Sequence, residues 1–325
     1  MRDPSLAPEV GGAPEPKPAS ATRVVAVVGP TAVGKTSLAE ELCVRLGGEI
    51  VSADAMQVYR RMDIGTAKQP FGERRVPYWC VDLVEPGEPF SAALYQQSAR
   101  AAIADITSRR RLPVLAGGTG LYVRSALDPM EFPAGEQSEN VVRAGYQMMA
   151  ESGGACELHS LLEVRDPASA SLIHPNNVRR VVRALEMLDE GVSYADQHAG
   201  FALRESVYDA RFVGLEMNRA HLYERIDRRV DEMVELGLLD EVRVLLESGL
   251  REALTASQAI GYKEFVPVVD GVESLANAVE SVKRASRRYA KRQLTWFRAD
   301  PRIRWIDVTD LSFDEAAEAA LGTLD

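Results

Sequence analysis

A run of β-branched residues that leads directly into a glycine-rich turn constrains the fold of this chain more than any other feature. The run "RVVAVV" at 23–28 is typical of a strand that is buried on both faces. The turn "GPTAVGKT" at 29–36 fits the pattern G-x-x-x-x-G-K-[ST], and "SLAEELCVRL" at 37–46 has leucines at helical spacing. A strand, a phosphate loop and a helix in this order predict an α/β fold of the P-loop NTPase-like type, in which helices flank a parallel sheet.

The phosphate loop predicts an anion site. Its glycines let the backbone N–H groups and the N-terminus of the following helix face a phosphate, while Lys35 supplies a mobile positive charge. The Thr36 hydroxyl is the predicted ligand of Mg²⁺, the one cofactor that we expect. Since the chain has neither an apolar run ending in a metal-holding Asp nor the guanine-reading pattern N-K-x-D, the identity of the bound diphosphate group stays open at this point. The expected contacts of the loop are Gly29, Ala32, Val33, Gly34, Lys35 and Thr36.

Four further strand patterns alternate with helical segments along the chain. Strands that alternate with helices imply a parallel sheet whose two faces are both covered. After the last long strand pattern, the chain is almost wholly helical from 219 to 298. The strand patterns are "EIVSA" at 49–53, "LPVLAGGTG" at 112–120, "RFVGLEM" at 211–217 and "RIRWIDV" at 302–308.

The sequence also predicts how the chain is divided into domains. Residues 128–199 lack a strand pattern, and a connection of that length is better explained by an inserted helical subdomain than by a loop. The core domain would then comprise 22–127 and 200–325. Residues 1–21 are biased toward Pro, Ala and Gly, which predicts a disordered tail.

Composition argues against several classes of protein. With 38 basic against 48 acidic residues the formal net charge is −10, so a surface that binds nucleic acid must be local. The three cysteines have no CxxC spacing, which indicates neither a zinc site nor a disulfide framework and fits a reducing compartment. No apolar run approaches the roughly 20 residues that span a bilayer. We therefore expect a cytoplasmic monomer with no membrane partner.

A carboxylate, Asp54, follows the second predicted strand. The carboxyl ends of parallel strands meet at one edge of a sheet, so Asp54 should lie in the same crevice as the phosphate loop. Beside phosphates a carboxylate is a magnesium ligand, a helix N-cap, or a general base. The turn "GGTG" at 117–120 follows the next strand, and it either lines the same crevice or is a plain turn.

A long basic helix is predicted near the end of the core, in "KRASRRYAKRQLTWFR" at 283–298. From 283 to 304 there are nine Lys or Arg residues against one acidic residue, Asp300. Such a run is either a solvated face or a surface for nucleic acid, and the missing acids favour the second interpretation. Val282, Tyr289 and Trp296 would face the core. Two rows of cations spaced four residues apart form the basic stripe, namely Lys283, Arg287 and Lys291, and Arg284, Arg288 and Arg292.

Six segments occur in the order found in one known family. The chain resembles bacterial tRNA dimethylallyltransferases over nearly everything from 23 to 300. The resemblance implies transfer of the dimethylallyl group from dimethylallyl diphosphate to N6 of adenosine 37, in the anticodon stem-loop of tRNAs that read codons beginning with U, with release of diphosphate. The segments are "GPTAVGKT", "SADAMQVYRRMDIGTAK", "GGTGLYVRSAL", "HPNNVRRVVRALEM", "AIGYKEF" and "RRYAKRQLTWFR".

The resemblance assigns roles to individual residues. Asp54 would be the general base toward the adenine amine, Thr31 would hydrogen-bond the leaving oxygen, and Arg225 would bind the diphosphate. The phosphate loop would accordingly hold the prenyl diphosphate. The tRNA contacts implied are Asp54, Ala55, Met56 and Gln57 near the target base, and Arg179, Arg180 and Arg183 in the insertion, together with the basic stripe.

Some positions depart from the family pattern, and alternative functions remain. The family usually has Ser at Ala55 and Asp at Asn177, and Tyr78 and Trp79 replace a pair of histidines. A prenyltransferase acting on free adenine nucleotides would need no long grip on RNA. A small-molecule kinase would share the phosphate loop but leave the basic helix unexplained, and a non-catalytic RNA-binding module would leave Asp54 without a role.

Overall fold

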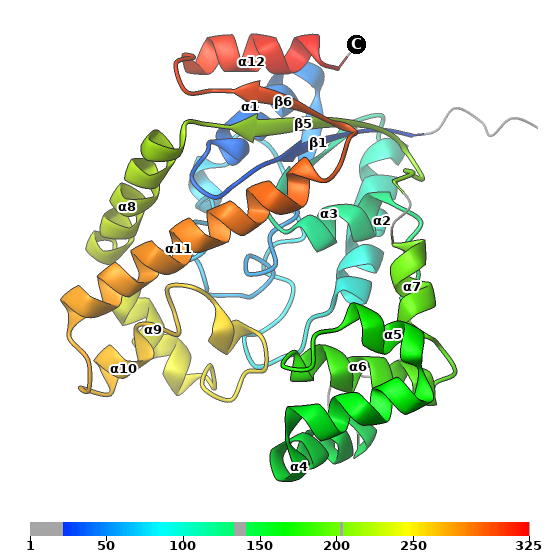
Figure 1. Ribbon diagram of the computed structural model, residues 1–325. Helices are drawn as coiled ribbons and strands as arrows, with labels where there is room; N and C mark the ends of the chain where they lie inside the picture. The colour runs from blue at the N-terminus through cyan, green and yellow to red at the C-terminus, as the bar shows by residue number, and fades with distance from the viewer. Residues whose placement is uncertain (1–21, 133–140, 202–203, 325) are drawn as a thin grey trace, which may run out of the picture.

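A parallel sheet organises the protein, as the sequence predicts, and it has six strands, one more than the five strand patterns of the sequence. The computed structural model describes residues 22–132, 141–201 and 204–324, so the predicted tail at 1–21 lies outside the described residues. The strand order is β3-β2-β4-β1-β5-β6, with every pair parallel, and Figure 1 shows β1, β5 and β6 side by side. This confirms the α/β class. The strands are β1 (Arg23–Val28), β2 (Gly48–Ser52), β3 (Tyr78–Trp79), β4 (Leu112–Gly117), β5 (Asp209–Glu216) and β6 (Ile303–Asp307).

Both faces of the sheet are covered by helices, because successive side chains of a strand point to opposite faces. In β1, Val25 and Val27 belong to the apolar core shared with two helices, α1 (Lys35–Leu46) and α12 (Phe313–Gly322). Val24, Ala26 and Val28 point to the opposite core. The helices that contribute to that second core include α2 (Ala92–Ser108), α3 (Gly120–Leu127) and the long α11 (Leu275–Arg298).

The carboxyl ends of β1, β2 and β4 bring three loops into contact. Val28 is in register with Gly117, and Ser52 with Ala116. The Thr119 N–H donates to the Ala53 carbonyl oxygen at 3.1 Å. A Cβ at Gly117 would overlap the backbone of Ala53, so only glycine permits this approach. The phosphate loop, the Asp54 segment and the "GGTG" turn are therefore pressed together at one sheet edge.

A helical layer lies beside this edge. Helix α8 (Arg219–Glu235) packs against α11, and Figure 1 shows α8 above the left end of α11, with α9 and α10 below it. The remaining elements of this region are α9 (Leu238–Glu247) and α10 (Val266–Val269), with two short 3₁₀ helices at Phe71–Glu73 and Ala256–Gln258.

The segment between α3 and β5 folds as a helical unit with its own apolar core. Its helices are α4 (Val141–Arg165), α5 (Pro167–Leu172), α6 (Val178–Asp189) and α7 (Tyr194–Gly200), at the lower right of Figure 1. Leu158 and Leu162 of α4 pack on Val181 and Leu185 of α6, all four fully buried. In the described part of the chain, no helix is both long and apolar enough to cross a bilayer.

Candidate active site

The phosphate loop has the geometry that anion binding needs. Gly34 has φ 107°, and α1 starts immediately after it, which turns the first backbone N–H groups of the helix outward. A Cβ at Gly29 would lie 2.5 Å from the Leu215 carbonyl oxygen, so glycine is required there as well. Lys35 Nζ donates to the Pro30 carbonyl oxygen at 2.6 Å. The loop lines a polar pocket of 490 Å³ to which Ala32, Gly34, Lys35 and Thr36 contribute.

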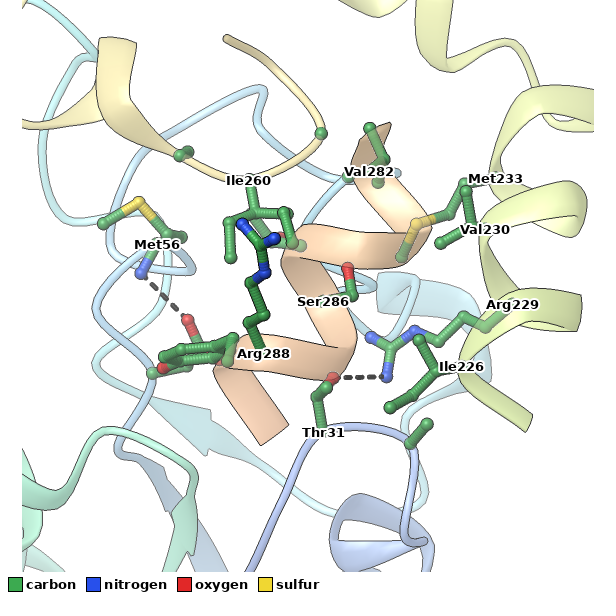
Figure 2. A pocket seen from close by; sticks show the side chains of 18 of the residues that line it. Thr31, Met56, Ile226, Arg229, Val230, Met233, Ile260, Val282, Ser286 and Arg288 are labelled. Atoms are coloured by element: carbon green, nitrogen blue, oxygen red, sulfur yellow. Dashed lines mark hydrogen bonds between the residues drawn. The ribbon is translucent and has the colours of Figure 1, made fainter. Parts of the chain in front are cut away.

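Three arginines from α8 line the same polar pocket. Arg225, Arg228 and Arg229 are spaced so that they share one face of the helix. Arg229 Nη1 donates to Thr31 Oγ1 at 3.4 Å, and Figure 2 shows this arginine reaching from α8 to the phosphate loop. Among the described residues, no carboxylate forms an ion pair with any of the three. The pocket therefore concentrates positive charge that an anion with several charges can neutralise.

The electrostatics of Lys35 reflect this excess of positive charge. Burial and the neighbouring Arg229 guanidinium lower the pKa of Lys35 to about 7, and the nearby Asp54 carboxylate only partly opposes this. Burial also lowers the pKa of Arg229 below its ordinary value, against the opposing charge of Asp54. A bound diphosphate would stabilise the charged forms of both side chains, so the electrostatics of the free pocket favour binding of a polyanion.

Asp54 lies just beyond β2 and lines a second pocket, of 480 Å³. Its Oδ1 accepts a hydrogen bond from the Met56 N–H at 2.9 Å. No helix begins at Asp54, so the helix N-cap interpretation is wrong, because the chain continues in turns. Together with burial, the negative charge of Asp54 raises the pKa of Tyr289, to about 12. The carboxylate thus faces a partly apolar space beside the phosphate loop.

The two pockets meet at Ala32 and Arg229, which line both. The wall next to that junction is apolar and comes from α8, α11 and the segment before α10. Figure 2 shows these side chains around the space, with Arg288 projecting from α11 toward Ile260. The arrangement offers a polar pocket for a diphosphate and, beyond Ala32 and Arg229, a second pocket that holds both an apolar wall for a hydrocarbon and the Asp54 carboxylate. The apolar residues are Ile226, Val230, Met233, Ile260 and Val282.

A buried glutamine fixes the loops relative to each other. Gln293 of α11 accepts from the Thr31 N–H at 2.8 Å and donates to the Gly118 carbonyl oxygen at 2.9 Å. Thr119 Oγ1 accepts from the Ala55 N–H at 3.0 Å. The "GGTG" turn therefore lines the crevice, through Thr119, and is more than a plain turn. One side chain of α11 holds both the phosphate loop and this turn.

Three further residues, Ala55, Met56 and Gln57, were predicted to lie near the target base, and only two of them line the pocket. Ala55 and Met56 line the pocket that holds Asp54. Gln57 does not contribute to that lining, and its amide is engaged, since Ser52 Oγ donates to its Oε1 at 2.9 Å and its Nε2 donates to the Thr66 carbonyl oxygen at 3.2 Å. These bonds fix the orientation of the amide and leave one acceptor position on its oxygen and one donor position on its nitrogen.

The basic stripe divides into two cations that are paired with acids and four that are not. Lys283 lies 2.7 Å from Asp231, and Arg287 forms an ion pair with Asp227, both acids belonging to α8. The expectation that compensating acids are missing is therefore wrong for these two cations. The cations for which no described carboxylate is an ion-pair partner are Arg284, Arg288, Lys291 and Arg292.

The packing of α11 also differs from the prediction. Val282 is buried and Tyr289 is partly buried against the pocket that holds Asp54, but Trp296 is 45% exposed and does not face the core. Gln293 and Phe297 occupy the buried face at that end of the helix instead. The reason is geometric, since a strict seven-residue spacing drifts around an α-helix by about 20° per repeat.

The insertion arginines lie on α6, away from both pockets. Arg179 and Arg180 are exposed, whereas Arg183 lies 3.6 Å from the buried carboxylate of Glu186. Asn177 caps the helix, because its side chain accepts from the Arg180 N–H. The substitution of Asn for the family Asp at this position thus keeps the capping bond.

Thr36 lies in the polar pocket with one carboxylate, Glu232. No cluster of three or more metal-binding side chains occurs in the described ranges. This donor set fits Mg²⁺, which keeps several waters and is usually held by one or two protein ligands together with substrate phosphates.

Sequence reasoning missed several residues of the site. Arg228 and Arg229 carried a usable signal, since they follow Arg225 at three and four residues in a helical segment. Gln293 carried none, because its contacts join segments far apart in the sequence, whereas Thr119 lies in the "GGTG" turn that the sequence already offered as a lining of the crevice.

The sequence model of a family described as IPP transferase matches residues 57–300. The chain belongs to the IPP transferase family. It is 48% identical over 292 residues to a tRNA dimethylallyltransferase of Geobacillus kaustophilus, covering 89% of this chain and 92% of that protein.

Solved structures of the IPP transferase family share the fold. The crystal structure of a tRNA isopentenylpyrophosphate transferase from Bacillus halodurans is 45% identical, with a TM-score of 0.67 and coverage of 93% of this chain and 96% of that one. A eukaryotic dimethylallyltransferase acting on tRNA is 29% identical, with a TM-score of 0.77 and coverage of 92% and 78%.

Proposed function

We propose that this protein is a tRNA dimethylallyltransferase. It transfers the dimethylallyl group from dimethylallyl diphosphate to N6 of adenosine 37, in the anticodon stem-loop of tRNAs that read codons beginning with U, and releases diphosphate. The observation that carries the proposal is the continuous site in which a polar pocket with three arginines joins, at Ala32 and Arg229, a second pocket that holds an apolar wall and Asp54. The names of relatives that match nearly the whole chain support the same reaction.

The donor would bind with its two ends in different environments. The backbone of the phosphate loop, Lys35 and the arginines Arg225, Arg228 and Arg229 surround the diphosphate. The apolar wall receives the five-carbon group, with about 0.8 kcal/mol gained per buried CH₂. This division explains why a phosphate loop is followed by a hydrocarbon pocket, which a small-molecule kinase does not need.

The acceptor reacts at the Asp54 end of the site. The exocyclic amine of adenine is a weak nucleophile, because its lone pair is delocalised into the ring. As a nitrogen–carbon bond forms at C1 of the dimethylallyl group, the carbon–oxygen bond to diphosphate breaks and a proton passes to Asp54. A positioned base of this kind typically contributes about 10²- to 10⁴-fold to the rate. Thr31 and Arg229 are bonded to each other beside the junction of the pockets, where charge develops on the leaving oxygen.

Mg²⁺ bound through Thr36 would supply further charge neutralisation on the diphosphate. The protein's own contribution is independent of it, since Lys35 and the α8 arginines already line that pocket. We propose that the active species is a monomer.

The RNA would be held on two surfaces. Arg284, Arg288, Lys291 and Arg292 of α11 are available for phosphates next to the catalytic pocket, whereas Lys283 and Arg287 would first have to leave their partners on α8. Arg179 and Arg180, with Arg183 behind them, form the second surface on α6. Two grips on the backbone are what extrusion of a stacked base from an RNA loop requires.

In the test, the purified protein is incubated with carbon-labelled dimethylallyl diphosphate and either unmodified tRNA or free AMP. The nucleosides are then identified by mass analysis. We expect label on adenosine 37, and a loss of at least about 10²-fold in kcat for Asp54→Asn. Asp310→Asn is the matched control, because this exposed carboxylate lies just before α12 and lines neither pocket. Label on AMP alone would move the function to free-nucleotide prenylation, and phosphate transfer from ATP would move it to a kinase.

A further inference from the structure

A surface groove beside the catalytic pocket combines an exposed aromatic ring with several cations. The groove has a volume of 690 Å³. Arg288 and Arg292 line both this groove and the pocket that holds Asp54, so the two hollows are adjacent. The lining includes Arg204, Arg288, Lys291, Arg292, Thr295 and Trp296.

Trp296 is fixed in place by the backbone of the "GGTG" turn. A Cβ at Gly120 would overlap the indole ring, so the ring lies directly against this glycine. Gly120 follows Thr119, whose hydroxyl holds the Ala55 N–H beside Asp54. The indole is nevertheless 45% exposed, which leaves a rigid aromatic surface open to solvent next to the site of chemistry.

The cations of α11 that line this groove are not neutralised by described ion pairs. In the part of the chain that the structure describes, Arg288, Lys291 and Arg292 have no ion-pair partner, whereas Lys283 and Arg287 are paired with acids of α8. A pattern of unpaired cations around an exposed aromatic ring is typical of surfaces that bind single-stranded nucleic acid, where the cations contact phosphates and the ring stacks on a base.

We propose that Trp296 is a stacking platform for an unpaired base of the RNA substrate, the neighbour of the adenine that enters the catalytic pocket. The proposal rests on the proposed function, which supplies the RNA. Extruding one base from a stack leaves its neighbour with a bare face, and an aromatic ring next to the pocket replaces the lost contact. Arg288, Lys291 and Arg292 contact the phosphates that flank the two bases.

The first experiment compares Trp296→Ala, Trp296→Phe and the wild type for binding and prenylation of an anticodon hairpin. We expect Trp296→Ala to raise the Kd for the hairpin and the KM roughly 5- to 150-fold, the effect of one lost base stack. Trp296→Phe retains an aromatic ring and should recover most of the loss. The kcat at saturating RNA and the Kd for dimethylallyl diphosphate should not change. Phe313→Ala is the matched control, since Phe313 is an equally exposed aromatic, 46%, on α12.

The second experiment removes the base instead of the ring. Hairpins with an abasic site on either side of the target adenosine are titrated by fluorescence anisotropy, which needs no catalysis. At one of the two positions the wild type should lose the same factor in affinity as Trp296→Ala, and Trp296→Ala should be insensitive to that removal. Equal losses in both proteins, or an unchanged Kd in Trp296→Ala, would overturn the proposal. If the intact hairpin binds as expected but is not prenylated, the proposed function fails and the stacking platform stands.

Discussion

Lys35 is the residue whose chemistry depends most on what fills the site. In the free protein its pKa is lowered to about 7 by burial and by Arg229. A bound diphosphate adds negative charge beside the ammonium group and raises that pKa. The free energy of donor binding that comes from charged Lys35 is therefore complete below pH 7 and is lost as the pH rises through the pKa of the bound state.

This difference predicts proton uptake on donor binding. At pH 8 most of Lys35 is neutral in the free protein, so binding of dimethylallyl diphosphate should take up close to one proton, and the Kd should rise up to tenfold per unit between pH 7 and the bound pKa. Calorimetry in two buffers of different ionisation enthalpy measures the uptake. Lys35→Met should show none beyond that of the ligand itself, and identical uptake in the two proteins would contradict the assignment.

At the scale of elements, the strands and α11 show what the sequence predicts and what it misses. The five longer strands were predictable because each carries a short apolar or alternating pattern, such as the continuous run of β1 and the alternation of β6, while the two-residue β3 has no periodicity to detect. The row of cations on α11 was visible as well. Its ion pairs with Asp227 and Asp231 were not, because they depend on how α8 packs against α11. Trp296 was assigned to the core because residues seven apart share a helix face only approximately, and the drift over two repeats moves Trp296 off the buried face.

The difference between paired and unpaired cations on α11 predicts unequal effects of two lysine-to-alanine substitutions. Lys291→Ala removes an unpaired cation, so tRNA affinity should fall and the slope of log K against log salt should flatten by about 1. Lys283→Ala removes a cation already paired with Asp231, so the salt slope should change by much less. Filter binding at four or more salt concentrations measures both slopes. Equal flattening by the two variants would show that the Asp231 pair opens when RNA binds.

For the whole molecule, the core and the insertion have separate apolar cores and each carries its own basic surface. The catalytic pockets belong to the core alone, since no described residue of the insertion lines them. The core would then carry the reaction and one RNA-binding surface, and the insertion would carry the second RNA-binding surface. Arg183 is a poor probe of that second grip, because its removal also disturbs the buried Glu186.

Arg179 and Arg180 are the better probes, because they are exposed and their guanidinium groups have no described ion-pair partner. The double variant Arg179→Ala/Arg180→Ala should weaken tRNA binding and flatten the salt slope by about 2, without changing the Kd for dimethylallyl diphosphate. Its effect on binding free energy should add to that of Lys291→Ala, because residues on separate bodies with no shared partner act independently. Unchanged binding across salt would place the RNA on the core alone. A combined loss smaller than the sum would mean that the two surfaces hold the RNA alternately and not together.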